Sequence, residues 1–252
     1  MGPITNRLVL WNIDLTLMDV ARVSREAYAE AFRRVTGRPL VALPQLAGRS
    51  DSEIFFESLA LNDVPSGPKD GAGTAQAGQE LLAKYSWELA EAFGARRDLL
   101  TQQGRLLPGA ADAVRATAAL PGVLQSVLTG TIRPNAALKL AAFGLSDWFD
   151  LDIGGFGADA YPKGSQLLSC RTQAEEKYHT RVPVDAMVYL ADSGRDVGAA
   201  RIAGVPCIAV ASGRSTASDL TGAGADLVLA DLSDTAGVAA AVDRLTRAAA
   251  TR

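Results

Sequence analysis

The chain has 252 residues, of which 48% are hydrophobic and 21% are charged, and its formal net charge is −3. These values are typical of a globular protein with one large domain, or with one domain and a smaller insert. They exclude the strongly basic surface of a nucleic-acid-binding protein, and no apolar run is long enough to cross a membrane.

The N-terminus lacks the charged-then-apolar pattern of a signal peptide. The two cysteines, Cys170 and Cys207, have no metal-ligand spacing, and the single histidine, His179, has no second histidine to form a zinc site with. We therefore expect a soluble, intracellular and cytoplasmic protein whose partners include no nucleic acid and no membrane.

The first expected strand ends in polar residues. Residues 8–11 are continuously apolar, which predicts a strand buried on both faces. Asn12, Asp14 and Thr16 follow at a spacing of two, which places them on one side of an extended backbone. Open α/β sheets bind their ligands at such strand ends, so this stretch is a candidate site. A strand followed by an Asx-type turn is the alternative explanation of this stretch alone.

A helical block follows, and we expect no strand between residues 18 and 100. The expected helices span 20–35, 51–59 and 75–100. Ser50 and Glu53 have the spacing of a capping box at the start of the second helix.

Strands and helices alternate in the remainder of the chain. The expected strands lie at 124–130, 150–153, 186–191, 207–210 and 227–229, and the helices at 108–120, 134–143, 163–180, 196–203, 215–223 and 234–249. This order predicts an α/β fold with a doubly wound, mostly parallel sheet. Residues 1–17 and 104–252 would form this core domain, and residues 18–103 an inserted α-helical cap domain.

Three of the expected strands end in residues that suit metal or phosphate binding. The ends carry Asn12 with Asp14, Thr129 with Gly130, and Asp192 with Asp196. In a doubly wound sheet these ends converge on one crevice. Three carboxylates packed together without a cation would destabilise the fold, whereas a hard divalent ion such as Mg²⁺ relieves the repulsion.

The same crevice has groups for a phosphate. The Thr129 hydroxyl and the Gly130 amide precede a helix and can hold two phosphate oxygens. Lys163 opens a later helix and can neutralise another oxygen. Together these residues indicate phosphoryl transfer, in which positioning and charge neutralisation carry most of the catalysis.

The residues resemble the four motifs of the haloacid dehalogenase superfamily, in the phosphatase branch with a helical cap after the first strand (the phosphoglycolate phosphatase and β-phosphoglucomutase type). Residues 12–16, Asn-Ile-Asp-Leu-Thr, are similar to the family's Asp-x-Asp-x-Thr motif. Thr129 matches the Thr or Ser that closes a hydrophobic strand, and Lys163 matches the third-motif Lys or Arg. Residues 191–196, Ala-Asp-Ser-Gly-Arg-Asp, match Gly-Asp-x-x-x-Asp except that alanine replaces the first glycine. The motifs span the whole chain in the family's order.

The resemblance implies a Rossmann-like core, Mg²⁺ as the cofactor and a small phosphorylated substrate. Position 12 would be the nucleophile and a Mg²⁺ ligand, and Asp14 the general acid/base and a ligand through its carbonyl. Asp192 would bind Mg²⁺ with support from Asp196, while Thr129, Gly130 and Lys163 would bind phosphate. Arg49, at the start of the second helix, would either reach the substrate when the cap closes or be a solvated arginine.

Position 12 departs from the family pattern because it is asparagine. A neutral amide is a poor nucleophile, so we expect the phosphoaspartyl intermediate to form very slowly or not at all. Two interpretations stay open: a deliberate Asp→Asn replacement in an active phosphatase, or a natural, non-catalytic member that binds a phosphorylated ligand. A phosphomutase is a weaker third interpretation.

Overall fold

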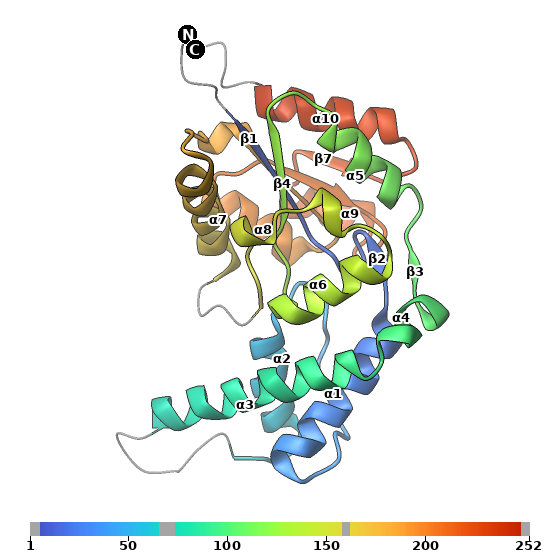
Figure 1. The fold of residues 1–252 in the computed structure, drawn as a ribbon, viewed down its shortest axis with the longest axis vertical. Helices are drawn as coiled ribbons and strands as arrows, with labels where there is room; N and C mark the ends of the chain where they lie inside the picture. Colours follow the sequence, from blue (N-terminus) through green and yellow to red (C-terminus); the bar gives the residue numbers. More distant parts are fainter. Residues whose placement is uncertain (1–5, 66–73, 158–161, 248–252) are drawn as a thin grey trace.

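The computed structural model describes residues 6–65, 74–157 and 162–247. Its centre is a sheet of five parallel strands in the order β4-β1-β5-β6-β7 (Figure 1). The strands are β1 Arg7–Trp11, β4 Val123–Val127, β5 Met187–Ala191, β6 Cys207–Val210 and β7 Leu227–Leu229. The expected doubly wound, parallel α/β sheet is confirmed.

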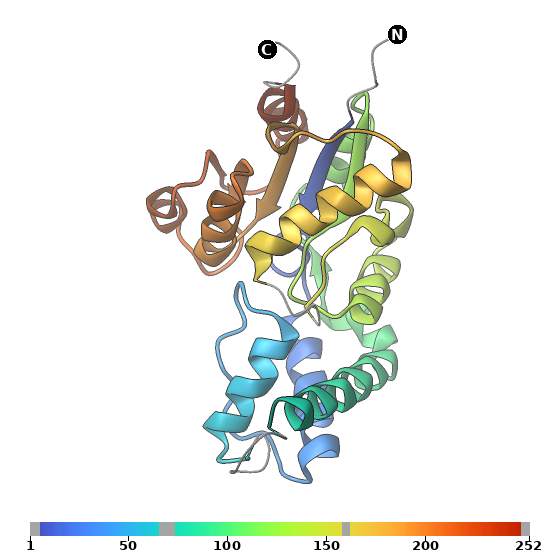
Figure 2. The same cartoon turned by 90° about the vertical axis from the view of Figure 1, so that its left-hand side faces the viewer.

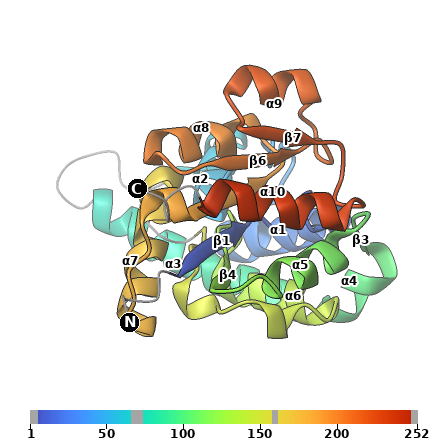
Figure 3. The same cartoon turned by 90° about the horizontal axis from the view of Figure 1, so that it is seen from above.

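Side chains of β1 alternate between two hydrophobic clusters, one on each face of the sheet. Leu8 and Leu10 belong to one cluster, and Val9 and Trp11 to the other. The first cluster includes α7 Lys163–Tyr178, α8 Gly194–Ala203 and α9 Ala217–Ala223, and the second includes α5 Ala110–Ala118, α6 Arg133–Ala142 and α10 Thr235–Arg247 (Figure 3). Because both faces are covered, the central strands are continuously apolar in sequence.

Four helices form a separate layer beyond the carboxyl ends of β1 and β4, and we call it the helical layer (Figures 1 and 2). They are α1 Ala21–Thr36, α2 Asp51–Leu61, α3 Thr74–Gly94 and α4 Arg97–Gln103. Tyr85, Leu89 and Phe93 recur at a spacing of four along α3 and are buried. The ring of Tyr85 stacks on Phe55 of α2 with centroids 4.0 Å apart. Both residues belong to the same hydrophobic cluster as Trp11, so apolar packing continues from this layer to the sheet.

Two expectations for this region were wrong. The long helix expected over 75–100 is two helices, since the chain turns after Gly94 and starts again at Arg97. A short strand, β2 Met18–Asp19, also pairs antiparallel with β3 Arg105–Leu106, which lies after the helical layer. Two residues are too short to show a strand period, so only the distant partner reveals this pairing.

The prediction of a strand over residues 150–153 was also wrong. Leu151–Ile153 is a 3₁₀ turn whose start is capped by Asp150, with the Asp152 amide donating to the Asp150 carboxylate at 3.0 Å. This local capping competes with extended structure. Extended pairing beside β4 occurs further along the chain, where Gly155 forms an isolated parallel bridge with Leu128.

The start of α2 lies directly against the sheet loops. The expected Ser50–Glu53 capping box is present. The backbone amide of Asp51, which follows Ser50, donates a hydrogen bond to the Gly130 carbonyl at 2.7 Å. A Cβ on Gly130 would lie 1.9 Å from the Arg49 carbonyl oxygen, so glycine is required here. The helical layer and the sheet therefore meet at the end of β4.

No helix in the described ranges is long and apolar enough to cross a membrane. Cys170 and Cys207 are both buried, where cysteine packs as a small hydrophobic residue.

Candidate active site

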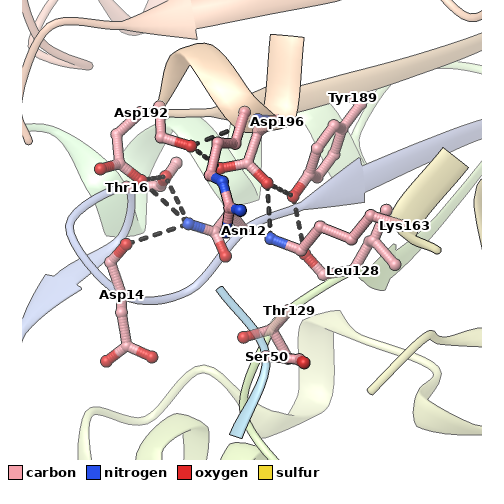
Figure 4. A network of polar contacts seen from close by, with 12 residues as sticks. Asn12, Asp14, Thr16, Ser50, Leu128, Thr129, Lys163, Tyr189, Asp192 and Asp196 are labelled. Atoms are coloured by element: carbon pink, nitrogen blue, oxygen red, sulfur yellow. Dashed lines mark hydrogen bonds and ion pairs between the residues drawn. The ribbon is translucent and has the colours of Figure 1, made fainter. Parts of the chain in front are cut away.

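Three adjacent strand ends bring the sequence-predicted residues together (Figure 4). Asn12 directly follows β1, and its backbone amide donates to the Leu190 carbonyl of β5 at 2.8 Å. On the other side of β1, the Leu128 amide donates to the Trp11 carbonyl at 3.0 Å. Parallel pairing therefore places Asn12, Asp192 and Thr129 at one edge of the sheet.

The side-chain amide of Asn12 is turned toward acceptors. Its Nδ2 donates to Asp192 Oδ1 at 2.9 Å and to the Asp14 carbonyl at 3.0 Å, and Thr16 Oγ1 lies 3.3 Å away. The Thr16 hydroxyl itself donates to Asp192 Oδ1 at 2.9 Å. Asn12 is 6% exposed, so these contacts satisfy a buried polar group.

Asp192 is a buried carboxylate at the end of β5, with 3% of its surface exposed. Burial first, and the nearby Asp196 carboxylate second, raise the pKa of Asp192 to about 7. The hydrogen bonds from Thr16 and Asn12 oppose this shift because they favour the ionised form.

Asp196 lies in the first turn of α8 and has no exposed surface. Its Oδ1 accepts from Lys163 Nζ at 2.5 Å, and the Tyr189 hydroxyl lies 3.0 Å from the same oxygen. Burial, followed by the Asp196 charge, raises the pKa of Tyr189 well above its ordinary range. The ion pair joins two residues expected to act at the site, the third-motif lysine and the last acid.

The Asp14 carboxylate points away from Asn12 (Figure 4). Both of its oxygens accept from Lys139 Nζ of α6, at 2.9 and 2.7 Å, and Oδ2 also accepts from the Thr131 hydroxyl at 2.9 Å. The Lys139 side chain is only 1% exposed and its Nζ lies 5.2 Å from the centre of the Phe93 ring. The pair is therefore a buried cation holding a partly exposed carboxylate.

Sequence reasoning missed Lys139 and Thr131. The only sequence signal for Lys139 is a charge between two leucines on a helix, Leu138 and Leu140. Such a lysine is usually a solvated residue at the edge of an apolar face. Its carboxylate partner is more than a hundred positions away, so the sequence pattern does not reveal the pair.

Asp51, the first residue of α2, connects the helical layer to the sheet. Its Oδ1 accepts from the Tyr28 hydroxyl of α1 at 2.7 Å, and its Oδ2 from the Ile132 amide before α6 at 2.8 Å. Burial raises the pKa of Asp51 to about 6, against the effect of the Tyr28 hydrogen bond and the Lys139 charge. Through these two hydrogen bonds the Asp51 carboxylate links α1 of the helical layer to the start of α6.

A cavity of about 80 Å³ opens between the helical layer and the sheet edge. The predicted residues that line it are Asn12, Asp14, Arg49, Thr129, Gly130, Lys163 and Asp192. Asp196 does not line it, and the guanidinium of Arg49 forms an ion pair with Glu57 of α2. Tyr28 and Thr131 also reach the cavity, and sequence reasoning did not assign either residue a role there.

The donors around Asn12 do not fit a cation as they are arranged. The Asp14 carbonyl and the Asp192 carboxylate are oxygen ligands of the kind that Mg²⁺ prefers. Between them lies an amide nitrogen with its hydrogens directed at both oxygens. Within residues 6–65, 74–157 and 162–247, no three acidic, histidine or cysteine side chains are grouped to hold a metal ion.

The Asp14–Lys139 pair makes a stability prediction. Asp14→Asn removes the carboxylate that pairs with Lys139, whose side chain is 1% exposed, and we expect it to lower the free energy of unfolding by about 3 kcal/mol. Lys139→Met in the same chain removes the stranded charge and should recover most of that loss. Urea unfolding of both single variants and the double variant measures the coupling; additive losses would contradict the pair.

Asp51 makes a pH prediction. Because its folded pKa is raised from 3.8 to about 6, its favourable contribution is complete below 3.8 and is lost as the pH rises through 6. Asp51→Asn removes the ionisation and keeps an acceptor for the Ile132 amide. We expect this variant to gain up to about 3 kcal/mol over the unmodified chain near pH 8, and much less near pH 4.

Unfolding free energies at several pH values test this, with the exposed Asp147→Asn as the matched control. A loss of stability in Asp51→Asn near pH 8 would show that the buried charge is net stabilising.

Comparisons with known proteins agree with the fold and with the family that the sequence resembles. The family model described as haloacid dehalogenase-like hydrolase matches residues 9–201, and a second, described as HAD-hydrolase-like, matches residues 170–235. No curated protein matches the chain.

Solved structures share the fold at low sequence identity. A HAD hydrolase of family IA, variant 3, from Entamoeba histolytica has a TM-score of 0.64 at 17% identity, covering 94% of this chain and 99% of its own. A hydrolase from Pseudomonas syringae has a TM-score of 0.61 at 18% identity, covering 92% and 97%. A predicted phosphoglycolate phosphatase from Haemophilus somnus has a TM-score of 0.61 at 16% identity, also covering 92% and 97%.

The family match spans more than half of the chain, with three motif-bearing strand ends inside it. The chain belongs to the haloacid dehalogenase-like hydrolase family.

Proposed function

We propose that this chain is a phosphatase of a small phosphorylated metabolite in which Asn12 impairs hydrolysis. The supporting observation is that Asn12 with Asp14, Thr129 and Asp192 line one cavity at the ends of three parallel strands, together with Lys163 at the start of α7. Such an arrangement suits phosphoryl transfer, because catalysis of this reaction depends mainly on positioning the reacting groups and stabilising their charge. The small cavity agrees with a small substrate.

Each residue has a proposed role. The side chain at position 12 faces the phosphorus and would be the nucleophile if it were aspartate. The Thr129 hydroxyl and the Gly130 amide bind phosphate oxygens, and Lys163 turns its ammonium from Asp196 to a third oxygen. Asp14 protonates the leaving oxygen, which requires its carboxylate to move out of the Lys139 pair.

Residues 18–103 are proposed to be a cap domain over the core domain of residues 1–17 and 104–252. The chain crosses between the two at Met18 and near Gly104, and β2 pairs with β3 at this crossing. A short antiparallel pair is a suitable hinge because it keeps both crossings together while the cap moves. Arg49 then approaches the substrate on closure if it leaves its ion pair with Glu57.

Magnesium is proposed only for the Asn12→Asp variant. In that variant the new carboxylate at position 12, the Asp192 carboxylate and the Asp14 carbonyl would all offer oxygen ligands, and Asp196 would support them. When bound, Mg²⁺ supplies charge neutralisation for the phosphoryl group.

Restoring the nucleophile tests the proposal. We expect Asn12→Asp, assayed with Mg²⁺ on a broad panel of phosphate monoesters, to gain at least ~10³-fold in kcat/KM on one of them. Asn12→Asp with Asp14→Asn is the matched control and should lose the gain, because the new nucleophile then lacks its acid/base. No activity of the Asn12→Asp variant on any ester would contradict the proposal.

A second candidate is a non-catalytic protein that binds a phosphorylated ligand, and the closed hydrogen bonds of Asn12 favour it. In that case the unmodified chain binds a phosphate ester tightly by calorimetry, Lys163→Met weakens the binding, and Asn12→Asp gains no turnover. Turnover in the restored variant separates the two candidates.

A further inference from the structure

The amide nitrogen of Asn12 lies where two metal-type oxygens converge. Asp192 Oδ1 and the Asp14 carbonyl are 2.9 and 3.0 Å from Nδ2, and Thr16 Oγ1 is 3.3 Å from it. A cation at this position would be held by the same oxygens. An N–H group partly neutralises an oxygen as a cation does, although with a smaller charge.

The orientation of this amide is fixed by its partners. The Asp14 carbonyl can only accept a hydrogen bond, and Thr16 uses its hydroxyl proton on Asp192 Oδ1. Turning the amide over would place Oδ1 of Asn12 against two oxygens with no proton between them. The nitrogen therefore faces Asp192, and Asn12 resists becoming an oxygen ligand.

The other two acids of the site already have their own cations. Asp14 is held by Lys139 at 2.7 Å and Asp196 by Lys163 at 2.5 Å. Asp192 is the third, and its donors are the Asn12 amide and the Thr16 hydroxyl. Each carboxylate of the motif set is thus satisfied by a side chain of this chain.

We propose that the Asn12 amide takes the place of the divalent cation, so that this chain assembles its site and holds a phosphate group without a metal. The part of this inference that concerns the phosphate group rests on the proposed function. The part that concerns the metal rests only on the contacts of Asn12. Asn12→Asp would reverse it, since a carboxylate oxygen would then face Asp192 Oδ1 with only the Thr16 proton between them.

The test is thermal unfolding of the unmodified chain and of Asn12→Asp, each in EDTA and in Mg²⁺. We expect no change in the Tm of the unmodified chain. The Tm of Asn12→Asp should be lower in EDTA and should rise by roughly 5 to 10 °C at a Mg²⁺ concentration of about 100 Kd. Gln79→Glu adds the same charge on the exposed side of α3 and is the matched control, with no Mg²⁺ response expected.

Two results would overturn the inference. One is an equal rise in Tm with Mg²⁺ in the unmodified chain and in Asn12→Asp. The other is no Mg²⁺ response in either, because the oxygens around position 12 would then not form a cation site at all.

Calorimetric titration of Mg²⁺ into the unmodified chain gives an independent answer if Asn12→Asp does not fold. No binding heat is expected, and saturable binding that Asp192→Asn removes would contradict the inference. None of these readouts uses turnover, so an Asn12→Asp variant that responds to Mg²⁺ but hydrolyses nothing would reject the proposed phosphatase and leave this inference standing.

Discussion

The site depends on one constraint, the burial of carboxylates where parallel strands end. Asp192 and Asp196 are 3% and 0% exposed, and an unpaired charge at that depth would destabilise the fold. The structure meets the constraint with side-chain donors: Asn12 and Thr16 at Asp192, and Lys163 at Asp196. The identity of residue 12 is therefore an electrostatic choice as well as a chemical one. Aspartate would supply a nucleophile and add a charge, whereas asparagine removes both.

The same constraint joins the helical layer to the sheet. Asp51 of α2 accepts hydrogen bonds from Tyr28 on one side and from the Ile132 amide on the other. Lys139, buried on α6, holds Asp14 and also lowers the pKa of Asp51 against the effect of burial. A change in the contact between the layers thus alters the surroundings of the proposed general acid. Lys139 also lies over the Phe93 ring of α3, so closure of the proposed cap has a route to the chemistry through this residue.

The sequence was sufficient wherever a local pattern controls the structure. Continuous apolar runs predicted β1 and β5, their polar ends placed Asn12 and Asp192, and the Ser50–Glu53 spacing predicted a capping box that is present. It failed where a partner lies far along the chain. Met18–Asp19 is a strand only because Arg105–Leu106 pairs with it, and Lys139 contacts Asp14 only because α6 turns it toward that carboxylate. At Asp150 the error was local, since a side-chain cap replaced an expected strand.

The central claim is that the amide of Asn12 stands where a cation would bind. A crystal structure of the unmodified chain grown with Mg²⁺, compared with one of Asn12→Asp grown in the same way, tests it most directly. The account predicts no metal among Asn12, the Asp14 carbonyl and Asp192 in the first crystal, with the amide nitrogen still facing Asp192. It predicts Mg²⁺ at about 2.0–2.1 Å from the carboxylate oxygens in the second. A Mg²⁺ ion bound to the amide oxygen of Asn12 in the unmodified chain would contradict it.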